Sequence, residues 1–291
     1  MPRFCSVLTL LFFITAFSSC AFRRIHRDKG IVYQEETKAA SGEILAPQKL
    51  DVFVPKKIKK GEDLPVLVFV HGGNWNSGNR GLYRWLGSRL ARKGMLAVVI
   101  DYPLSPAARY DDMAQSTAAA LAWTAKHAAD YGANPERIFV SGHSAGGQLS
   151  ALVALDSQYL RRAGADTGIL EGAILIDAAG LDLYTYLKDE NGLAENPSYA
   201  QTFTADPAEW KKASPIFNIS SKQLPLLIFQ GGKTYPSIVR STARFLDTLQ
   251  RKESRVDFHL LPGKKHIPMI TQFLNTFNPQ YDTILEFMER K

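Results

Sequence analysis

The chain has 291 residues, of which 45% are hydrophobic and 22% are charged, and its formal net charge is +7. This composition predicts one large packed domain with a short appendage and excludes intrinsic disorder. The basic residues are scattered and no nucleic-acid recognition motif accompanies them, so we expect no nucleic-acid partner and favour a nearby anionic membrane. Both cysteines, Cys5 and Cys20, precede the expected domain, which excludes a disulfide, a cysteine metal site or a catalytic cysteine there.

Residues 1–19 have the pattern of an export signal. Arg3 stands in a short basic start, and an apolar run over residues 7–17 follows it. That run is too short for a comfortable membrane span. Its end, "FSSC", resembles a bacterial lipoprotein processing site, which implies cleavage before Cys20 and a lipid anchor on its thiol. We therefore expect an exported, membrane-anchored protein at the periplasmic or cell-surface side, with an ordinary secretory peptide as the alternative.

The stretch after Cys20 is basic and lacks apolar periodicity. We expect residues 20–30 to form a tether that lies near lipid headgroups. The folded domain is expected to occupy residues 31–291.

Short apolar runs alternate with amphipathic stretches along this domain. Apolar and β-branched runs predict strands at residues 49–55, 65–73, 95–102, 137–142, 172–180, 224–232 and 256–263. Helical spacing predicts helices at residues 81–94, 111–132, 145–155, 237–252 and 271–291. Strands that alternate with crossover helices predict an α/β fold, with a mainly parallel central sheet and helices on both faces.

Residues 182–218 interrupt this alternation. They contain no predicted strand but carry the aromatic residues Tyr184, Tyr186, Tyr199, Phe203, Trp210 and Phe217. We expect a small helical insertion that covers the carboxyl edge of the sheet, where open α/β folds bind ligands. Ordinary packing explains any single one of these aromatic side chains equally well.

The stretch "VSGHSAGG" holds the strongest chemical signal. Residues 142–146 fit the pattern G-x-S-x-G, directly after a predicted strand and before a predicted helix. This is the context of a nucleophile elbow, in which a sharp turn presents the serine at the top of the sheet. Ser144 is therefore the predicted nucleophile.

A second glycine motif, "VFVHGGNW", follows an early strand. Backbone amides in such a loop can stabilise an oxyanion, and glycine leaves room for its approach. We expect the amides of Gly73, Asn74 and Ala145 to form an oxyanion hole. His71 precedes the nucleophile and is expected to order this loop, because the histidine of such sites follows the nucleophile in the chain.

Two histidines follow Ser144. His259 lies inside the alternating strand pattern "VDFHLLP", whereas His266 lies just beyond it in the turn "PGKKHIP". A turn can bring an imidazole down toward the nucleophile, so His266 is the predicted general base.

The motifs "HGGNW", "GHSAGGQL", "ASPIFN" and "LPGKKH" together resemble the α/β-hydrolases of the carboxylesterase type. The chain is similar, over about residues 50–270, to hormone-sensitive-lipase-like esterases, bacterial feruloyl-esterase-like proteins and kynurenine formamidase. The resemblance implies an α/β-hydrolase fold and a serine esterase without metal or organic cofactor, acting on a small-molecule or glycan-linked ester. A small aryl-formamide amidase and a non-catalytic binding protein on the same fold are the alternatives.

The chain departs from the family pattern in a minor way at Tyr102-Pro103, where the family often has Tyr-Arg, and in a major way at the position of the acid. The family's acid stands three residues after Gly231, where this chain has Thr234. In some lipases of the fold the acid follows the preceding strand instead, and Asp177, in "IDAAG", occupies that place. Asp182 is the second candidate, although we expect it to cap a helix. A Ser–His dyad whose ring is oriented by Thr234 or by a backbone carbonyl is the third possibility.

Overall fold

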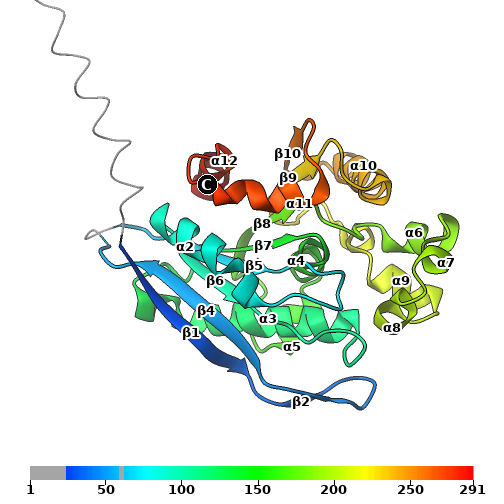
Figure 1. Ribbon diagram of the computed structural model, residues 1–291, viewed down its shortest axis with the longest axis horizontal. Coiled ribbons are helices and arrows are strands. Elements are labelled where there is room, and N and C mark those ends of the chain that lie inside the picture. The colour runs from blue at the N-terminus through cyan, green and yellow to red at the C-terminus, as the bar shows by residue number, and fades with distance from the viewer. Residues whose placement is uncertain (1–23, 59–61, 291) are drawn as a thin grey trace, which may run out of the picture.

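In the computed structural model, which describes residues 24–58 and 62–290, eight strands form a central sheet in the order β1-β4-β6-β5-β7-β8-β9-β10. Its strands are β1 (Ile25–Gln34), β4 (Gln48–Pro55), β5 (Val66–Val70), β6 (Leu96–Ile100), β7 (Ile138–His143), β8 (Leu170–Ile176), β9 (Leu226–Gly231) and β10 (Val256–Leu261). Strands β2 (Thr37–Lys38) and β3 (Ile44–Leu45) form a separate pair. The strands from β5 to β10 are parallel, and β1 and β4 are antiparallel to their neighbours. Figure 1 shows the arrangement.

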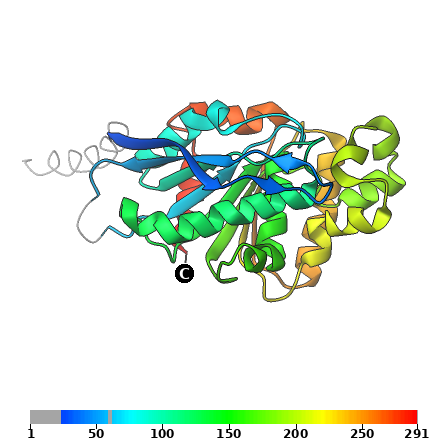
Figure 2. The same ribbon diagram turned by 90° about the horizontal axis from the view of Figure 1, so that it is seen from below.

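Helices cover both faces of this sheet, as Figures 1 and 2 show. The α-helices are α2 (Arg84–Arg92), α3 (Tyr110–His127), α4 (Ala145–Leu155), α5 (Gln158–Arg162), α6 (Leu183–Asp189), α7 (Gly192–Glu195), α8 (Tyr199–Phe203), α9 (Pro207–Lys212), α10 (Pro236–Arg251), α11 (His266–Thr271) and α12 (Gln280–Glu289). The 3₁₀ helices are η1 (Arg80–Tyr83), η2 (Ala128–Tyr131), η3 (Pro215–Asn218) and η4 (Gln272–Leu274).

The core lies on the two faces of the sheet. One apolar cluster joins the sheet to α3, α4 and α10, and the other joins it to α2, α11 and α12. Strands β5, β6 and β7 are buried along their whole length, which explains their continuous apolar sequences. The predicted α/β architecture, a mainly parallel sheet with helices on both faces, is confirmed.

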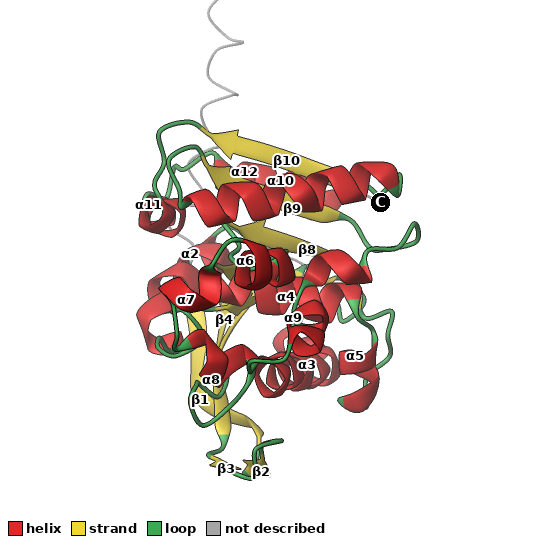
Figure 3. Cartoon of the chain, turned by 90° about the vertical axis from the view of Figure 1, so that its right-hand side faces the viewer, coloured by secondary structure: helices red, strands yellow, loops and turns green. Residues whose placement is uncertain are grey.

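The predicted helical insertion is also present. Helices α6 to α9 and η3 fill residues 183–218 and stand together at the carboxyl edge of the sheet, as Figure 3 shows from that side. Along the longest axis of the molecule, they lie at the end opposite the start of β1 in both Figures 1 and 2.

The structure differs from the sequence-based expectation at residues 25–30, which belong to β1 and not to a tether. Ile25 pairs with Pro55 of β4 and packs on the core, although the neighbouring side chains are polar and exposed. An edge strand is held by its backbone hydrogen bonds and needs few apolar residues. Residues 1–23, including the expected signal and Cys20, lie outside the described residues.

The last predicted helix, residues 271–291, is also shorter than expected. Helix α12 begins only at Gln280, because Pro279 disfavours helical geometry at the residue before it. The Asn278 side chain accepts a hydrogen bond from the Gln280 amide, 3.0 Å away, and so satisfies the start of α12. Among the helices of residues 24–58 and 62–290, none is both long and apolar enough to cross a membrane.

Candidate active site

Ser144 occupies a strained turn between β7 and α4. Its backbone has φ 56° and ψ −121°, outside the regions that L-residues favour. A Cβ atom added at Gly142 would lie 2.2 Å from the Gly146 carbonyl oxygen, and one added at Gly146 would lie 2.2 Å from that of Val70. Only glycine fits these two positions, so the G-x-S-x-G sequence is what allows the turn.

His266 and Asp177 extend from Ser144 in a line of hydrogen bonds. The Ser144 Oγ lies 2.9 Å from His266 Nε2, and His266 Nδ1 lies 2.6 Å from Asp177 Oδ2. A carboxylate can only accept, so Nδ1 carries the proton and Nε2 is free to accept from the serine hydroxyl. The structure therefore brings together three of the residues singled out from the sequence.

The Asp177 carboxylate is buried, and both of its oxygens accept hydrogen bonds. It follows β8 and has a positive φ of 47°. The Gly231 amide donates to Oδ1 across 2.9 Å, and the Thr234 hydroxyl donates to Oδ2. Thr234 stands at the position where related proteins carry the acid, and here its hydroxyl contacts the Asp177 carboxylate. The Thr234 Oγ1 is 3.5 Å from His266 Nδ1.

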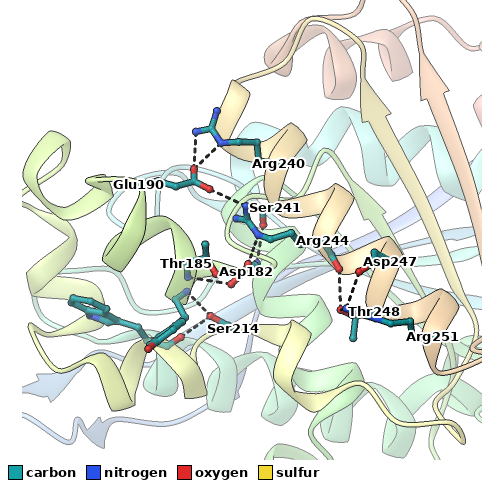
Figure 4. A network of polar contacts seen from close by, with 12 residues as sticks. Asp182, Thr185, Glu190, Ser214, Arg240, Ser241, Arg244, Asp247, Thr248 and Arg251 are labelled. Atoms are coloured by element: carbon teal, nitrogen blue, oxygen red, sulfur yellow. Dashed lines mark hydrogen bonds and ion pairs between the residues drawn. The ribbon is translucent and has the colours of Figure 1, made fainter.

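Asp182, the second candidate acid, lies elsewhere. Its side chain accepts from the Thr185 amide and so caps α6, as expected, and it also pairs with Arg244 of α10. Arg244 in turn reaches Glu190, as Figure 4 shows. No contact with His266 is present in the described part of the chain, so Asp182 is wrong as a partner for the imidazole because helix capping and Arg244 occupy it.

The loop after β5 lies beside Ser144, since a Cβ added at Gly72 would be 3.2 Å from the Ser144 Cβ. Gly73, Asn74 and Trp75 all have positive φ, and a Cβ at Gly73 would lie 2.1 Å from the Ser77 carbonyl oxygen. Among the hydrogen bonds of the described residues, the amides of Gly73 and Asn74 donate to no protein acceptor. The same holds for the Ala145 amide at the start of α4. All three amides are therefore available to donate hydrogen bonds to a ligand oxygen.

His71 orders this loop, as the sequence predicts. Its Nδ1 lies 2.9 Å from the Gly72 carbonyl oxygen, and the Tyr102 hydroxyl donates to the His71 carbonyl oxygen across 3.0 Å. Burial lowers the pKa of His71 below its usual value, which keeps the ring neutral.

His143, the residue before Ser144, has a role that the sequence reasoning missed. Its Nε2 lies 3.2 Å from the backbone carbonyl oxygen of His266, and the two rings are 4.7 Å apart. Burial, and then repulsion from His266, lower the pKa of His143 to about 4. A neutral ring can donate to the His266 carbonyl and hold that turn. Its place inside the G-x-S-x-G motif was the signal that could have found it.

Comparison with known proteins agrees with this geometry. The BD-FAE family model matches residues 50–243, more than half of the chain. The chain belongs to the BD-FAE family. The α/β-hydrolase relationship of the carboxylesterase type predicted from the sequence is confirmed.

Relatives of this BD-FAE member include named esterases. A probable carboxylic ester hydrolase, LipM of Mycobacterium tuberculosis, is 31% identical over 254 residues, which cover 84% of this chain and 57% of LipM. A probable isoprenylcysteine alpha-carbonyl methylesterase of Oryza sativa subsp. japonica is 28% identical, covering 94% of this chain and 62% of the relative. The chain therefore spans less than two thirds of either protein. Esterase B of Lactobacillus rhamnosis shares the fold, with TM-score 0.71, 18% identity and coverage of 96% of this chain and 90% of that one.

Aromatic side chains of the insertion border the site of this BD-FAE protein. Trp75 packs edge-on against Tyr199 and Phe203, and the Tyr199 hydroxyl donates to Asn74 Oδ1 across 2.8 Å. A small pocket of about 40 Å³ opens between the insertion and α10. It is lined by Trp75, Ala179, Gly180, Asp182, Leu183, Tyr186, Tyr199, Ser237, Ile238 and Ser241.

The donor set of the site is that of nucleophilic chemistry. In residues 24–58 and 62–290, no group of three or more His, Cys, Asp or Glu side chains could hold a metal ion. The hydrogen-bonded line from Ser144 to Asp177 instead matches what a serine nucleophile and an oriented imidazole need.

Proposed function

We propose that this BD-FAE protein hydrolyses carboxylic esters through an acyl-enzyme on Ser144. The observation that carries the proposal is the continuous line Ser144 Oγ–His266 Nε2–Nδ1–Asp177, with both contacts at hydrogen-bond distance. In this line His266 is the general base and Asp177 is the acid of the triad.

The chemistry follows from the positions of these groups. Ser144 Oγ attacks the ester carbonyl carbon while its proton moves to His266 Nε2, and the carbonyl oxygen becomes an oxyanion. The amides of Gly73, Asn74 and Ala145 would receive that oxygen. The tetrahedral species collapses, and the leaving alcohol takes the proton from His266.

Water then completes the reaction. It gives a proton to His266 Nε2 and attacks the acyl carbon, and the acid leaves as Ser144 regains its proton. Throughout, Asp177 keeps Nδ1 protonated and stabilises the imidazolium by its negative charge. The net reaction consumes one ester and one water and yields an acid and an alcohol.

Two features support an ester as the substrate. Relatives named as ester hydrolases and esterases favour it over an aryl formamide. The complete line of three side chains speaks against a protein that only binds, because such a protein has no need of it. The small pocket between the insertion and α10 favours a short acyl or alcohol group, on a free small molecule or on a glycan.

We also infer that the protein is exported and anchored through lipid on Cys20. The apolar run that ends in "SSC" supports this inference. A Cys20→Ser variant should leave the membrane fraction, whereas wild-type protein that is freely soluble after export would contradict the anchor.

A fluorophosphonate probe tests the proposed activity most directly. Wild-type protein should lose p-nitrophenyl acetate hydrolysis as the probe phosphonylates Ser144 and releases fluoride. The Ser144→Ala variant should fold, resist labelling and show no hydrolysis above background. Full activity in that variant, or no labelling of the wild type, would overturn the proposal. A panel of p-nitrophenyl esters from acetate to octanoate then reads the chain length that the pocket accepts.

A further inference from the structure

We propose that the amino edge of the sheet docks on anionic phospholipid headgroups. The docking surface, called the basic face below, consists of Arg24, Arg27, Lys56 and Arg92. These four side chains line one open groove together with Ile25 and His26. The proposal does not depend on ester hydrolysis, and it concerns the end of the molecule away from Ser144.

Folding brings the four cations together from three elements. Arg24 and Arg27 stand at the start of β1, Lys56 directly follows β4, and Arg92 is the last residue of α2. The Lys56 amide donates to the Arg24 carbonyl oxygen across 2.9 Å, which fixes the two chain segments against each other.

Strand register and helix packing place Arg27 and Arg92 on the same side of the sheet. Arg27 lies opposite Phe53 in the β1–β4 pair, and Phe53 shares a core cluster with the apolar residues of α2. The last turn of α2 therefore lies on the same side of the sheet as Arg27. Basic residues far apart in the sequence thus form one surface.

The four cations of the basic face carry charge that the protein does not neutralise. Among the described residues, none of them forms an ion pair, whereas partly buried cations elsewhere do, such as Arg80 with Asp51. The carboxylate of Asp28, the nearest acidic residue on β1, accepts from His26 at 3.0 Å. Arg24, Arg27 and Lys56 are exposed. An external anion would relieve the mutual repulsion of this surface.

The position of the chain start points to a membrane as the source of that anion. Arg24 is four residues after Cys20, and four extended residues span at most about 14 Å. A lipid on Cys20 would therefore hold the basic face within reach of the headgroups. Anionic lipids attract each nearby Lys or Arg by about 1 kcal/mol, which is roughly a fivefold gain in partitioning.

Such docking would turn the proposed active site toward the solvent. Lys56 and Arg92 lie where the parallel strands begin, because β4 runs antiparallel to β6 and ends beside its first residues. Ser144 lies at the other end of β7, whose six residues span about 20 Å. Figures 1 and 2 place the start of β1 and the insertion at opposite ends. The arrangement suits substrates that arrive from water and not from the bilayer.

The test uses residues 20–291 with Cys20→Ser, so that no lipid contributes. Sedimentation with vesicles of 30% phosphatidylglycerol in phosphatidylcholine should carry the protein down, and vesicles of phosphatidylcholine alone should not. Replacing Arg24, Arg27, Lys56 and Arg92 by Gln should lower partitioning by roughly 600-fold, the product of four fivefold gains. Hydrolysis of p-nitrophenyl acetate by the quadruple variant should stay as in the parent, which separates this test from that of the proposed activity.

A matched control removes four exposed cations from the carboxyl-edge half of the molecule. The variant with Lys38, Lys49, Lys188 and Lys211 replaced by Gln has the same net charge as the basic-face variant and should lose less than tenfold in partitioning. Equal losses in the two variants, or no phosphatidylglycerol dependence in the parent, would overturn the docking surface. So would complete release by 10 mM phosphate at constant ionic strength, since that indicates a small-anion site.

Discussion

The Asp177 carboxylate reaches His266 from β8 because the parallel strands β8 and β9 end within two residues of each other in the sheet. Ile176 pairs with Phe229, and the Asp177 amide donates to the Phe229 carbonyl across 2.7 Å. A side chain that follows either strand can therefore approach the same imidazole. Thr234 accordingly supplies a hydroxyl where the family has an acid, and its hydrogen bond adds to that of Gly231 on the carboxylate.

We expect Asp177→Asn to lower kcat by two to four orders of magnitude, because an amide cannot hold the required tautomer or stabilise the imidazolium. Thr234→Val should lower kcat by about tenfold or less, since it removes only one of the hydrogen bonds on the carboxylate. Steady-state hydrolysis of p-nitrophenyl acetate measures both.

The geometry also offers a rescue. Asp177→Asn combined with Thr234→Asp places a carboxylate at the family's usual position, where Oγ1 of the threonine is 3.5 Å from His266 Nδ1. The double variant should recover at least about tenfold of the lost kcat. A near wild-type kcat in Asp177→Asn alone would contradict Asp177 as the acid and favour a Ser–His dyad.

His143 should act as a positioning residue, since it contacts the His266 backbone and not the reacting atoms. His143→Leu removes the donor, so we expect kcat to fall by about tenfold with KM little changed, the result of a displaced imidazole. His143→Gln keeps an N–H donor and should stay within about threefold of the wild type. Equal losses in both variants would indicate a packing role alone.

The sequence alone could place Ser144 and His266 at strand ends, because both depend on local patterns of apolar runs and glycines. It could not decide between Asp177 and Asp182. That choice depends on tertiary contacts, which bring the Asp177 carboxylate to His266 and pair Asp182 with Arg244. The G-x-S-x-G motif does point to His143, but not to its partner, which is a backbone carbonyl more than one hundred residues away.

At the scale of elements, the buried strands were the easiest to predict. Strands β5 to β9 are apolar on both faces, so each appears as a continuous run. Strand β1 was missed because its pairing with β4 is a backbone property of an exposed edge. The break before α12 was missed because the apolar periodicity continues across Asn278 and Pro279.

The insertion is joined to α10 by charged side chains, which Figure 4 shows in detail. Arg244 of α10 pairs with the buried Asp182 and, at 2.9 Å, with Glu190, while Arg240 reaches the other Glu190 oxygen. These contacts hold α6 against α10 beside the small pocket. They are therefore expected to fix one wall of that pocket.

We expect Arg244→Met to lower the free energy of unfolding by about 2 kcal/mol, because it leaves the buried Asp182 without its counter-charge. The expected loss of stability is smaller than for a fully buried ion pair because a third of the Arg244 side chain is exposed. Urea unfolding at pH 7 measures it.

Arg251→Met is the matched control on the same helix. Arg251 pairs with Asp247 at 2.8 Å, but both side chains are mostly exposed. Its loss should change stability by less than about 0.5 kcal/mol. A change as large as that of Arg244→Met would show that charge on α10, and not the buried pair, matters.

At the scale of the whole molecule, the sheet separates two kinds of surface. Its carboxyl edge holds Ser144, His266 and the helical insertion, and its amino edge holds the basic face. This separation follows from topology, because Ser144 follows a parallel strand and Lys56 follows an antiparallel one. Composition alone gives only the net charge of +7, without its placement.

The whole fold should also lose stability in mild acid. Burial lowers the pKa of His143 from 6.5 to about 4 and also lowers that of His71. Between these values the unfolded chain binds protons that the folded chain does not, so the free energy of unfolding falls as the pH falls from about 6.5 toward 4. His143 alone should account for roughly 2 kcal/mol between pH 7 and pH 5.

Urea unfolding of the wild type and of His143→Gln at pH 7 and pH 5 tests this dependence. The variant lacks the titrating ring, so its loss of stability between the two pH values should be smaller by roughly 2 kcal/mol, whatever its stability at pH 7. Comparing the two differences cancels the cost of the substitution itself and the titration of the remaining groups. His71→Gln should reduce the loss in the same direction. An unchanged pH dependence in His143→Gln would mean that the ring accepts a proton inside the fold, and that its donation to the His266 carbonyl does not require a neutral imidazole.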